Sequence, residues 1–288
     1  MRWIAASLCC ASCLSKPALP SNGTSCQTWS PWGTPRALDE LNTPSNNEDG
    51  AWLSGNHLTL YYSSDATGEP LVYRATRSTA TGTFDPGAIV DELGTTNNSS
   101  EMSPFLSDDE RSIWLDSGGQ IYTATRTSND PVFSTPTIVG ELSGTPSDFV
   151  GEPSLTSDLE TIVYGFSIGG GQPATDLWIA TRGGADLPFD PPAKLVAPSV
   201  DNQSDCCPSL SGSGDLLLFS STRPNGVHRL WQSQRIGADY GNPTPLDIPG
   251  IPTESDEPFL TRDGAVLMFT VSASGGSDLW MVERTCMD

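Results

Sequence analysis

Acidic residues recur at intervals of about 50 residues, each close to the start of a short apolar segment, and they are Asp49, Glu101, Glu152, Asp205 and Glu257. Carboxylates grouped around one opening support more than one chemistry. A pair at a set separation hydrolyses glycosidic bonds, with one group as acid and the other as base or nucleophile. A larger group attracts a cation or a basic ligand. A single carboxylate next to proline also stabilises a loop by accepting hydrogen bonds from backbone N–H groups.

Other signatures of catalysis are weak in this sequence. His57 and His228 are the two histidines, and neither stands beside a Gly-x-Ser-x-Gly motif. The chain has no phosphate-binding loop, no dinucleotide fingerprint and no compact calcium loop. The adjacent Cys206 and Cys207 lack the partner spacing of a zinc site. We therefore expect no cofactor and no bound metal, and we place His228 in an exposed hairpin.

The elements that position the acids are encoded by a repeat. Each copy has a first strand that ends in leucine, a turn such as Asp263-Gly264, and then a second strand that is almost continuously apolar. Such runs are typical of strands covered on both faces. The leucines are Leu53, Leu106, Leu155, Leu210 and Leu260.

The third strand of each copy carries an aromatic residue with an arginine four residues later. An even spacing places both side chains on one face of a strand. The pairs are Tyr73 and Arg77, Tyr122 and Arg126, Trp178 and Arg182, Trp231 and Arg235, and Trp280 and Arg284. A row of ligand-stacking aromatics is one interpretation. We favour internal packing of each repeat, because a structural repeat preserves its own contacts.

A looser segment with proline follows each of the first four arginines, as in residues 84–90. Proline is tolerated at sheet edges, so this segment is the outer strand of its unit. Only four residues follow Arg284, and the missing segment stands at the front of the chain, in residues 29–38. The sequence predicts an all-β fold, a five-bladed β-propeller of four-stranded blades closed by this N-terminal outer strand. The five acids would then surround one mouth of the central channel.

Short motifs within the copies resemble the WD40-like Pro-Asp repeats of TolB-type propellers. They include Asp-Leu-Trp at residues 176–178 and 278–280, and Ser-Ser-Thr-Arg-Pro-Asn-Gly at residues 220–226. The resemblance covers residues 26–288, with departures at Ala51-Trp52 and at residues 272–274. It implies interaction in the cell envelope rather than catalysis. Five-bladed glycoside hydrolases, whose carboxylates project into the same channel, remain the alternative.

The N-terminus is typical of an export signal. Residues 1–15 combine Arg2 with a short apolar run, too short to span a bilayer as a helix. Ala11-Ser12-Cys13 resembles a lipoprotein signal, in which Cys13 is lipid-modified; cleavage to a secreted protein is the alternative. Residues 16–25 form a short tether before the propeller of residues 26–288. We expect a location in the bacterial periplasm or at the cell surface, with membrane contact only through the lipid anchor.

Four cysteines remain in the folded domain, and export permits disulfides. Cys26 precedes the predicted outer strand of the last blade, and Cys286 follows the third strand of the same blade. Those strands are adjacent and antiparallel, so we expect a Cys26–Cys286 disulfide. Cys206 and Cys207 are left as free thiols or as a strained vicinal link.

The charge of the chain narrows the class of partner. The formal net charge is −21, and Lys16 and Lys194 are the only lysines, which excludes a nucleic-acid surface. We expect a monomer that binds an envelope protein, a peptide or a glycan through the face that carries the five acids.

Overall fold

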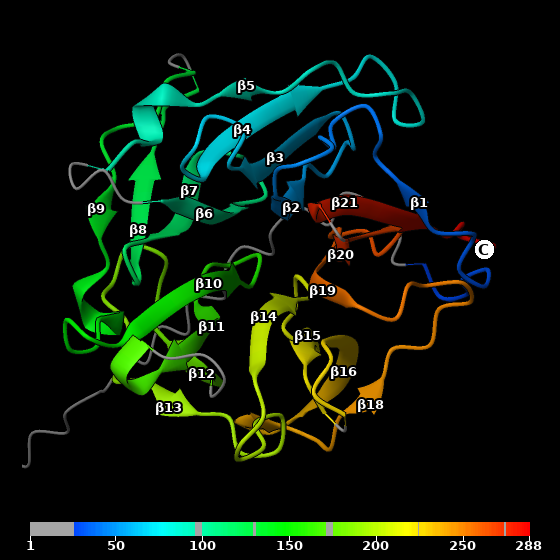
Figure 1. Ribbon diagram of the computed structural model, residues 1–288. Helices are drawn as coiled ribbons and strands as arrows, with labels where there is room; N and C mark the ends of the chain where they lie inside the picture. Colours follow the sequence, from blue (N-terminus) through cyan, green and yellow to red (C-terminus); the bar gives the residue numbers. More distant parts are fainter. Residues whose placement is uncertain (1–25, 96–99, 129–130, 171–174, 224, 274) are drawn as a thin grey trace, which may run out of the picture.

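The computed structural model describes residues 26–95, 100–128, 131–170, 175–223, 225–273 and 275–288. The predicted signal, the tether and Cys13 lie outside the described residues. Five antiparallel sheets stand around a central axis, which confirms the five-bladed propeller (Figure 1).

The blades follow one another along the chain. The first contains β2 (Glu48–Leu53), β3 (Thr59–Ser64), β4 (Leu71–Thr76) and β5 (Ala88–Ile89). The second contains β6 (Glu101–Leu106), β7 (Ser112–Ser117), β8 (Gln120–Thr125) and β9 (Thr137–Ile138). The third contains β10 (Phe149–Leu155), β11 (Thr161–Ser167), β12 (Asp176–Thr181) and β13 (Ala193–Lys194).

The fourth blade contains β14 (Asp205–Leu210), β15 (Leu216–Ser221) and β16 (Arg229–Ile236), with β17 (Asp239–Tyr240) and β18 (Thr244–Pro245) both paired to β16. The fifth contains β19 (Ser255–Leu260), β20 (Val266–Ala273), β21 (Gly276–Glu283) and β1 (Arg36–Ala37). Three short 3₁₀ helices are also described, at Asp91–Leu93, Gly140–Leu142 and Ile168–Gly170. None of the described helices is long and apolar enough to cross a membrane.

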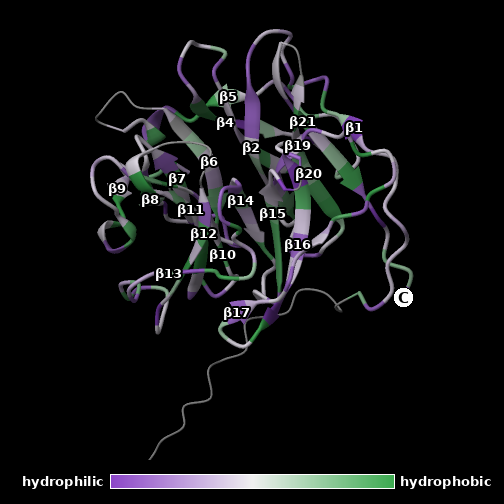
Figure 2. Ribbon diagram, turned by 60° about the horizontal axis from the view of Figure 1, so that its bottom comes forward, coloured by the Kyte–Doolittle hydropathy of each residue, from purple (hydrophilic) through white to green (hydrophobic). Residues whose placement is uncertain are grey.

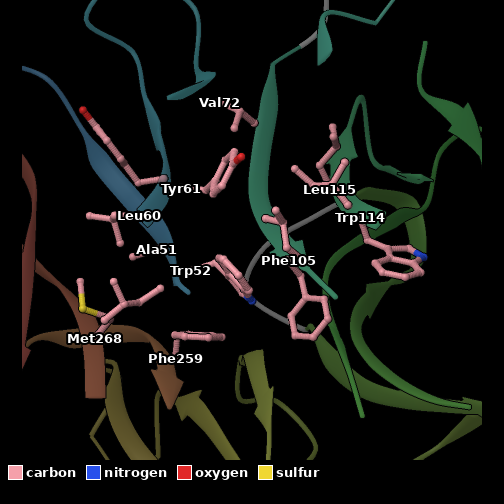
Figure 3. Close-up of a cluster of buried hydrophobic side chains, with 14 of the residues drawn as sticks. Ala51, Trp52, Leu60, Tyr61, Val72, Phe105, Trp114, Leu115, Phe259 and Met268 are labelled. Atoms are coloured by element: carbon pink, nitrogen blue, oxygen red, sulfur yellow. The ribbon is translucent and has the colours of Figure 1, made fainter. Parts of the chain in front are cut away.

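The core lies between neighbouring blades, as the apolar second strands predict. Every residue of β3 is buried. Figure 3 shows Trp52 between Tyr61 and Phe259, with ring centroids 6.1 Å and 6.0 Å from its own. Trp52 therefore joins the first blade to the last. Figure 2 shows the matching pattern, with hydrophobic colour inside the strands and hydrophilic colour mostly in the connecting loops.

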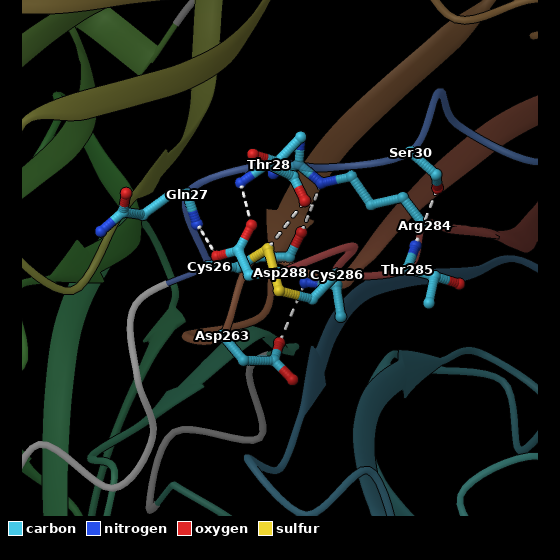
Figure 4. Close-up of a disulfide and its surroundings, with 11 residues drawn as sticks. Cys26, Gln27, Thr28, Ser30, Asp263, Arg284, Thr285, Cys286 and Asp288 are labelled. Atoms are coloured by element: carbon cyan, nitrogen blue, oxygen red, sulfur yellow. Dashed lines mark hydrogen bonds between the residues drawn. A yellow bond between two sulfur atoms is a disulfide. The ribbon is translucent and has the colours of Figure 1, made fainter.

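The N-terminal segment closes the ring as expected. Arg36 pairs with Met281 in β21, and an isolated bridge joins Trp29 to Cys286. Prolines interrupt this outer segment, so only two of its residues form a strand. The predicted Cys26–Cys286 disulfide is present, with Cα atoms 5.7 Å apart (Figure 4). It fastens the blade in which the two ends of the domain meet.

The repeated arginines serve internal packing. The Nε–H of Arg77 donates to the His57 carbonyl at 2.6 Å, and its guanidinium lies 4.4 Å from the Phe84 ring centroid. The Arg126–Phe133, Arg182–Phe189 and Arg284–Trp32 pairs repeat this contact at 4.3–4.5 Å. The aromatic partner belongs to an outer segment and not to the third strand, because the arginine extends beyond the strand end to the neighbouring loop.

Candidate functional site

Each inner strand contains a β-bulge near its start, and these bulges form the wall of the channel. The register shifts by one residue in all five inner strands, between Gly151 and Ser154 for example. One residue in each bulge has a positive φ of 49–59°: Gly50, Ser103, Glu152, Cys207 and Glu257. The residue that follows is alanine in the first blade and proline in the others. The bulge thus redirects one side chain toward the channel in every blade except the first, where the bulge residue is Gly50.

The bulges line a cavity that lies on the propeller axis. It encloses about 390 Å³ of empty space, counted to its open mouth, and its wall includes all five bulge residues, the prolines after them, Phe105 and Phe259. At the other end of the inner strands, Arg262 crosses the axis. It donates to the carbonyls of Leu155 and Leu210 at 2.9 Å and 3.0 Å and pairs with Asp108 at 2.7 Å. The channel is therefore a funnel narrowed by Arg262 at its far end.

Hydrogen bonds from one blade to the next hold the bulges in place. The N–H of Ser103 donates to the Ser63 hydroxyl at 3.1 Å, and the N–H of Glu257 donates to the Ser220 hydroxyl at 3.0 Å. In the second blade the acceptor is a carboxylate, because the N–H of Glu152 donates to Asp116 Oδ2 at 3.0 Å. Ser63, Asp116 and Ser220 occupy equivalent positions on the second strands.

In the third and fifth blades, the acceptor for the next blade is the side chain of the bulge glutamate itself and not a second-strand residue. In the third blade the equivalent position is Gly165, and Glu152 Oε2 fills the space that its side chain would need. Glu152 accepts the N–H of Cys207 at 2.7 Å. In the fifth blade, Glu257 accepts the N–H of Gly50 at 2.7 Å and the Thr270 hydroxyl at 2.9 Å. Both carboxylates therefore join adjacent blades as well as lining the channel.

The carboxylates around the channel are hard to ionise together. Burial, followed by the charge of neighbouring acids, raises the pKa of Asp49 well above its usual range. Burial raises the pKa of Glu152 to about 8 and that of Glu257 to about 7, and nearby acids add to both shifts. Burial also raises the pKa of Asp116 to about 6. The funnel therefore favours protonation or a bound cation.

The structure places the five predicted acids differently from one another. Glu152 and Glu257 line the cavity, and the charge of Glu257 adds to the raised pKa of Glu152. Asp49 directly precedes the bulge residue Gly50, and the charge of Glu257 also adds to the burial that raises its pKa. Asp205 is fully buried beside the channel wall, where it pairs with Arg223 and accepts the N–H of Val200 at 2.7 Å. The backbone of Glu101 belongs to β6, but its side chain lies outside the described part of the structure. Glu101 and Asp205 each stand two positions before the bulge residue of their strand. The alignment of the copies in the sequence did not reveal this offset.

Sequence reasoning missed a mixed cluster beside the funnel. Cys206 precedes the bulge residue Cys207, and their Sγ atoms are 2.6 Å apart. Cys206 Sγ lies 3.9 Å from Asp256 Oδ1, and the other Asp256 oxygen is hydrogen-bonded to His228 Nδ1. This bond raises the pKa of His228, whose side chain is only 28% exposed, contrary to the exposed hairpin that we expected. The sequence contained one indication of this cluster. Asp256 directly precedes Glu257, and Cys206 and Cys207 occupy the matching positions in the preceding copy.

The thiol, imidazole and carboxylate of Cys206, His228 and Asp256 lie within 4.8 Å of one another, as do the ligand atoms of Glu152, Cys206 and Cys207. The second histidine, His57, is remote from this cluster in the β2–β3 turn, where Nε2 lies 3.0 Å from Asp263 Oδ2. Sulfur, nitrogen and oxygen ligand atoms thus lie close together in this cluster.

Comparison with known proteins supports the architecture. No protein-family model matches the chain, and no curated protein matches it. Among solved structures, the chain is similar to an α-L-arabinofuranosidase of Podospora anserina at 12% identity and a TM-score of 0.60, covering 90% of this chain and 97% of that one. The catalytic domain of an α-L-arabinofuranosidase of Coprinopsis cinerea matches at 12% identity and a TM-score of 0.61, covering 88% and 97%.

A TolB of Acinetobacter baumannii is also similar, at 13% identity and a TM-score of 0.48, covering 83% of this chain and 55% of that one. At these identities the likeness concerns the fold alone. The fold of this chain is thus similar to that of the two arabinofuranosidases.

Proposed function

We propose that this chain is an extracytoplasmic binding propeller of the cell envelope, without catalytic activity, whose ligand inserts a positively charged group into the acidic mouth of the funnel. One observation carries the proposal. Acids of four blades lie close together. Burial raises their pKa values, and an imbalance of negative charge among neighbouring acids adds to the shifts of Asp49, Glu152 and Glu257. A cationic group of a peptide or envelope protein would relieve that imbalance.

The role of the two bulge glutamates also supports binding over hydrolysis. Glu152 and Glu257 each use one oxygen to hold the backbone of the next blade. A carboxylate fixed in this way keeps a constant position, as a rigid binding site requires. The disulfide between Cys26 and Cys286 supports an oxidising, extracytoplasmic location. The lipid anchor at Cys13 and the monomeric state remain predictions.

The test uses short peptides that carry lysine or arginine, with matched glutamate peptides as a reference. Binding of the basic peptides, measured by calorimetry, should weaken with added salt. The double variant Glu152→Gln, Glu257→Gln should weaken it further, by about fivefold or more. The control is Asp85→Asn, Asp190→Asn, which makes the same change from carboxyl to amide at two exposed residues of the outer segments. Equal binding by both variants, with lower stability in the first, would show that the glutamates serve only to join the blades.

Glycoside hydrolysis remains the second candidate, because one observation favours it. A pKa of about 8 leaves Glu152 protonated at neutral pH, as a general acid must be, while nearby carboxylates offer a base. A panel of aryl glycosides, including an α-L-arabinofuranoside, separates the two functions. Turnover that disappears in Glu152→Gln would replace the binding proposal with an enzymatic one.

A further inference from the structure

Three side chains that are remote in sequence converge where the fourth and fifth blades meet the funnel. Cys206 belongs to β14, Asp256 belongs to β19, and His228 directly precedes β16. Their ligand atoms lie within 4.8 Å of one another, and Cys206 Sγ is 3.9 Å from Asp256 Oδ1. The three groups therefore already stand around one small volume.

The bulge of β14 makes this arrangement possible. Adjacent residues of a regular strand point to opposite faces. The positive φ of Cys207, 57°, interrupts that alternation and brings its Sγ to 2.6 Å from that of Cys206. Glu152 of the third blade lies beside both thiols. Five potential ligand atoms from three blades thus meet at one edge of the funnel.

The chemistry of this set selects the class of ion. A thiolate, an imidazole and a carboxylate together match the borderline softness of Zn²⁺, whereas Ca²⁺ and Mg²⁺ prefer oxygen ligands alone. Cys206 is buried, while the side chains of His228 and Asp256 are 28% and 21% exposed. Solvent thus reaches the cluster from the His228 side, which gives an ion a route of access.

We propose that Cys206, His228 and Asp256 bind Zn²⁺, with a fourth coordination position open toward Cys207 and Glu152. The imidazole and the carboxylate, which now share a hydrogen bond, would each turn a lone pair to the metal. Three protein ligands and one open position are the arrangement that lets zinc hold a water or a group of a second molecule. The site does not depend on the proposed binding of basic ligands.

Titration with Co²⁺ under anaerobic conditions tests the site directly. The purified, chelator-treated protein should bind one Co²⁺ with a sulfur-to-cobalt charge-transfer band in the near ultraviolet, and Zn²⁺ should displace it. Cys206→Ser should abolish the band. His228→Asn and Asp256→Asn should each weaken Zn²⁺ binding by about tenfold or more, measured by competition with a chromophoric chelator.

His57→Asn is the matched control, because it removes the other histidine from a turn remote from the cluster. Circular dichroism of each variant establishes that the fold is retained. Unchanged Zn²⁺ affinity in folded Cys206→Ser, or no Co²⁺ binding by wild-type protein with both thiols reduced, would overturn the proposal. A stable Cys206–Cys207 disulfide in the protein purified from an oxidising compartment, detected by intact mass, would also overturn it.

Discussion

Glu152 shows how a single side chain acquires its role from a neighbour. Its second-strand partner position is occupied by Gly165, so the carboxylate enters the vacant space and accepts the Cys207 N–H. Burial, followed by the charges of Asp116, Glu257 and Asp256, opposes ionisation of Glu152. Because ionisation of Glu152 is unfavourable in the folded protein, its folding stability should depend on pH.

We expect the melting temperature to fall as pH rises from about 5 to 8, because Glu152 has a folded-state pKa of about 8 against an ordinary value of 4.5. Between these values the folded state holds a proton that the unfolded state has released, so raising the pH favours unfolding. Glu152→Gln retains an acceptor for the Cys207 N–H and cannot ionise. The melting temperature of this variant should therefore fall less than that of the wild type over the same pH range. The difference should be about 2–4 °C for each kcal/mol of unfolding free energy that ionisation of Glu152 costs the wild type.

Melting curves recorded by circular dichroism in chelator-treated samples, at half-unit pH steps, measure this difference. Asp190→Asn, at an exposed position, controls for the change in net charge. Parallel pH profiles of wild type and Glu152→Gln would mean that Glu152 is ionised in the folded protein at neutral pH.

The bulged inner strand is the element that turns a repeated sheet into a site. Its positive φ values require either glycine or a residue whose strain is offset by a bond to the next blade. Gly50 occupies this position in the first blade with φ of 59°, and a Cβ there would lie 2.9 Å from Ser103 Cα. The first and second blades therefore approach closely because residue 50 has no side chain.

Gly50→Ala should destabilise the propeller by about 1–3 kcal/mol, since backbone strain and the close approach act together. Gly55→Ala is the control, because a Cβ at Gly55 meets no atom within 4 Å. It should change stability by less than about 0.5 kcal/mol. Urea unfolding of the two variants gives both values. If Gly50→Ala is as stable as Gly55→Ala, the close approach of the first two blades does not require glycine at position 50.

The β19–β20 turn is a second element with a task beyond its own blade. Arg262 extends from it to the carbonyls of Leu155 and Leu210, and to Asp108. The third, fourth and second blades are thereby joined to the fifth at the narrow end of the funnel.

Arg262→Ala should lower the free energy of unfolding by about 2–3 kcal/mol, because charged hydrogen bonds to two backbone carbonyls are lost. Arg111→Ala removes an arginine whose side chain is 56% exposed, and should have little effect. Chemical denaturation measures both. If Arg262→Ala lowers the free energy of unfolding no more than Arg111→Ala does, the packing of the blades at the narrow end of the funnel does not depend on Arg262.

At the scale of the whole molecule, stability depends on joining the two ends of the chain in one blade. The two-residue strand β1 makes few backbone bonds to β21, and the Cys26–Cys286 disulfide lies just beyond them (Figure 4). Asp288 adds hydrogen bonds from the N–H groups of Gln27 and Thr28. The disulfide links two residues that are 260 positions apart, so it reduces the conformational entropy of the unfolded chain.

Cys26→Ser, Cys286→Ser should lower stability by about 2–4 kcal/mol, as is usual for loss of a native disulfide. Thermal unfolding of the double variant measures the loss, and intact mass of the non-reduced wild type verifies the bond. Unchanged stability would show that β1 and the aromatic contacts of Arg284 close the ring alone.

The sequence alone determined the number of blades, the closing segment and the disulfide. These depend on local patterns that repeat, such as apolar second strands and the aromatic-to-arginine spacing, together with the count of outer segments. Only the tertiary structure decided which acids share the channel. A bulge shifts the register by one residue, so Glu152 and Glu257 take the bulge position while Asp205 is directed to Arg223. The cluster of Cys206, His228 and Asp256 was equally hidden, because its members come from separate segments that meet only when neighbouring blades pack around the axis.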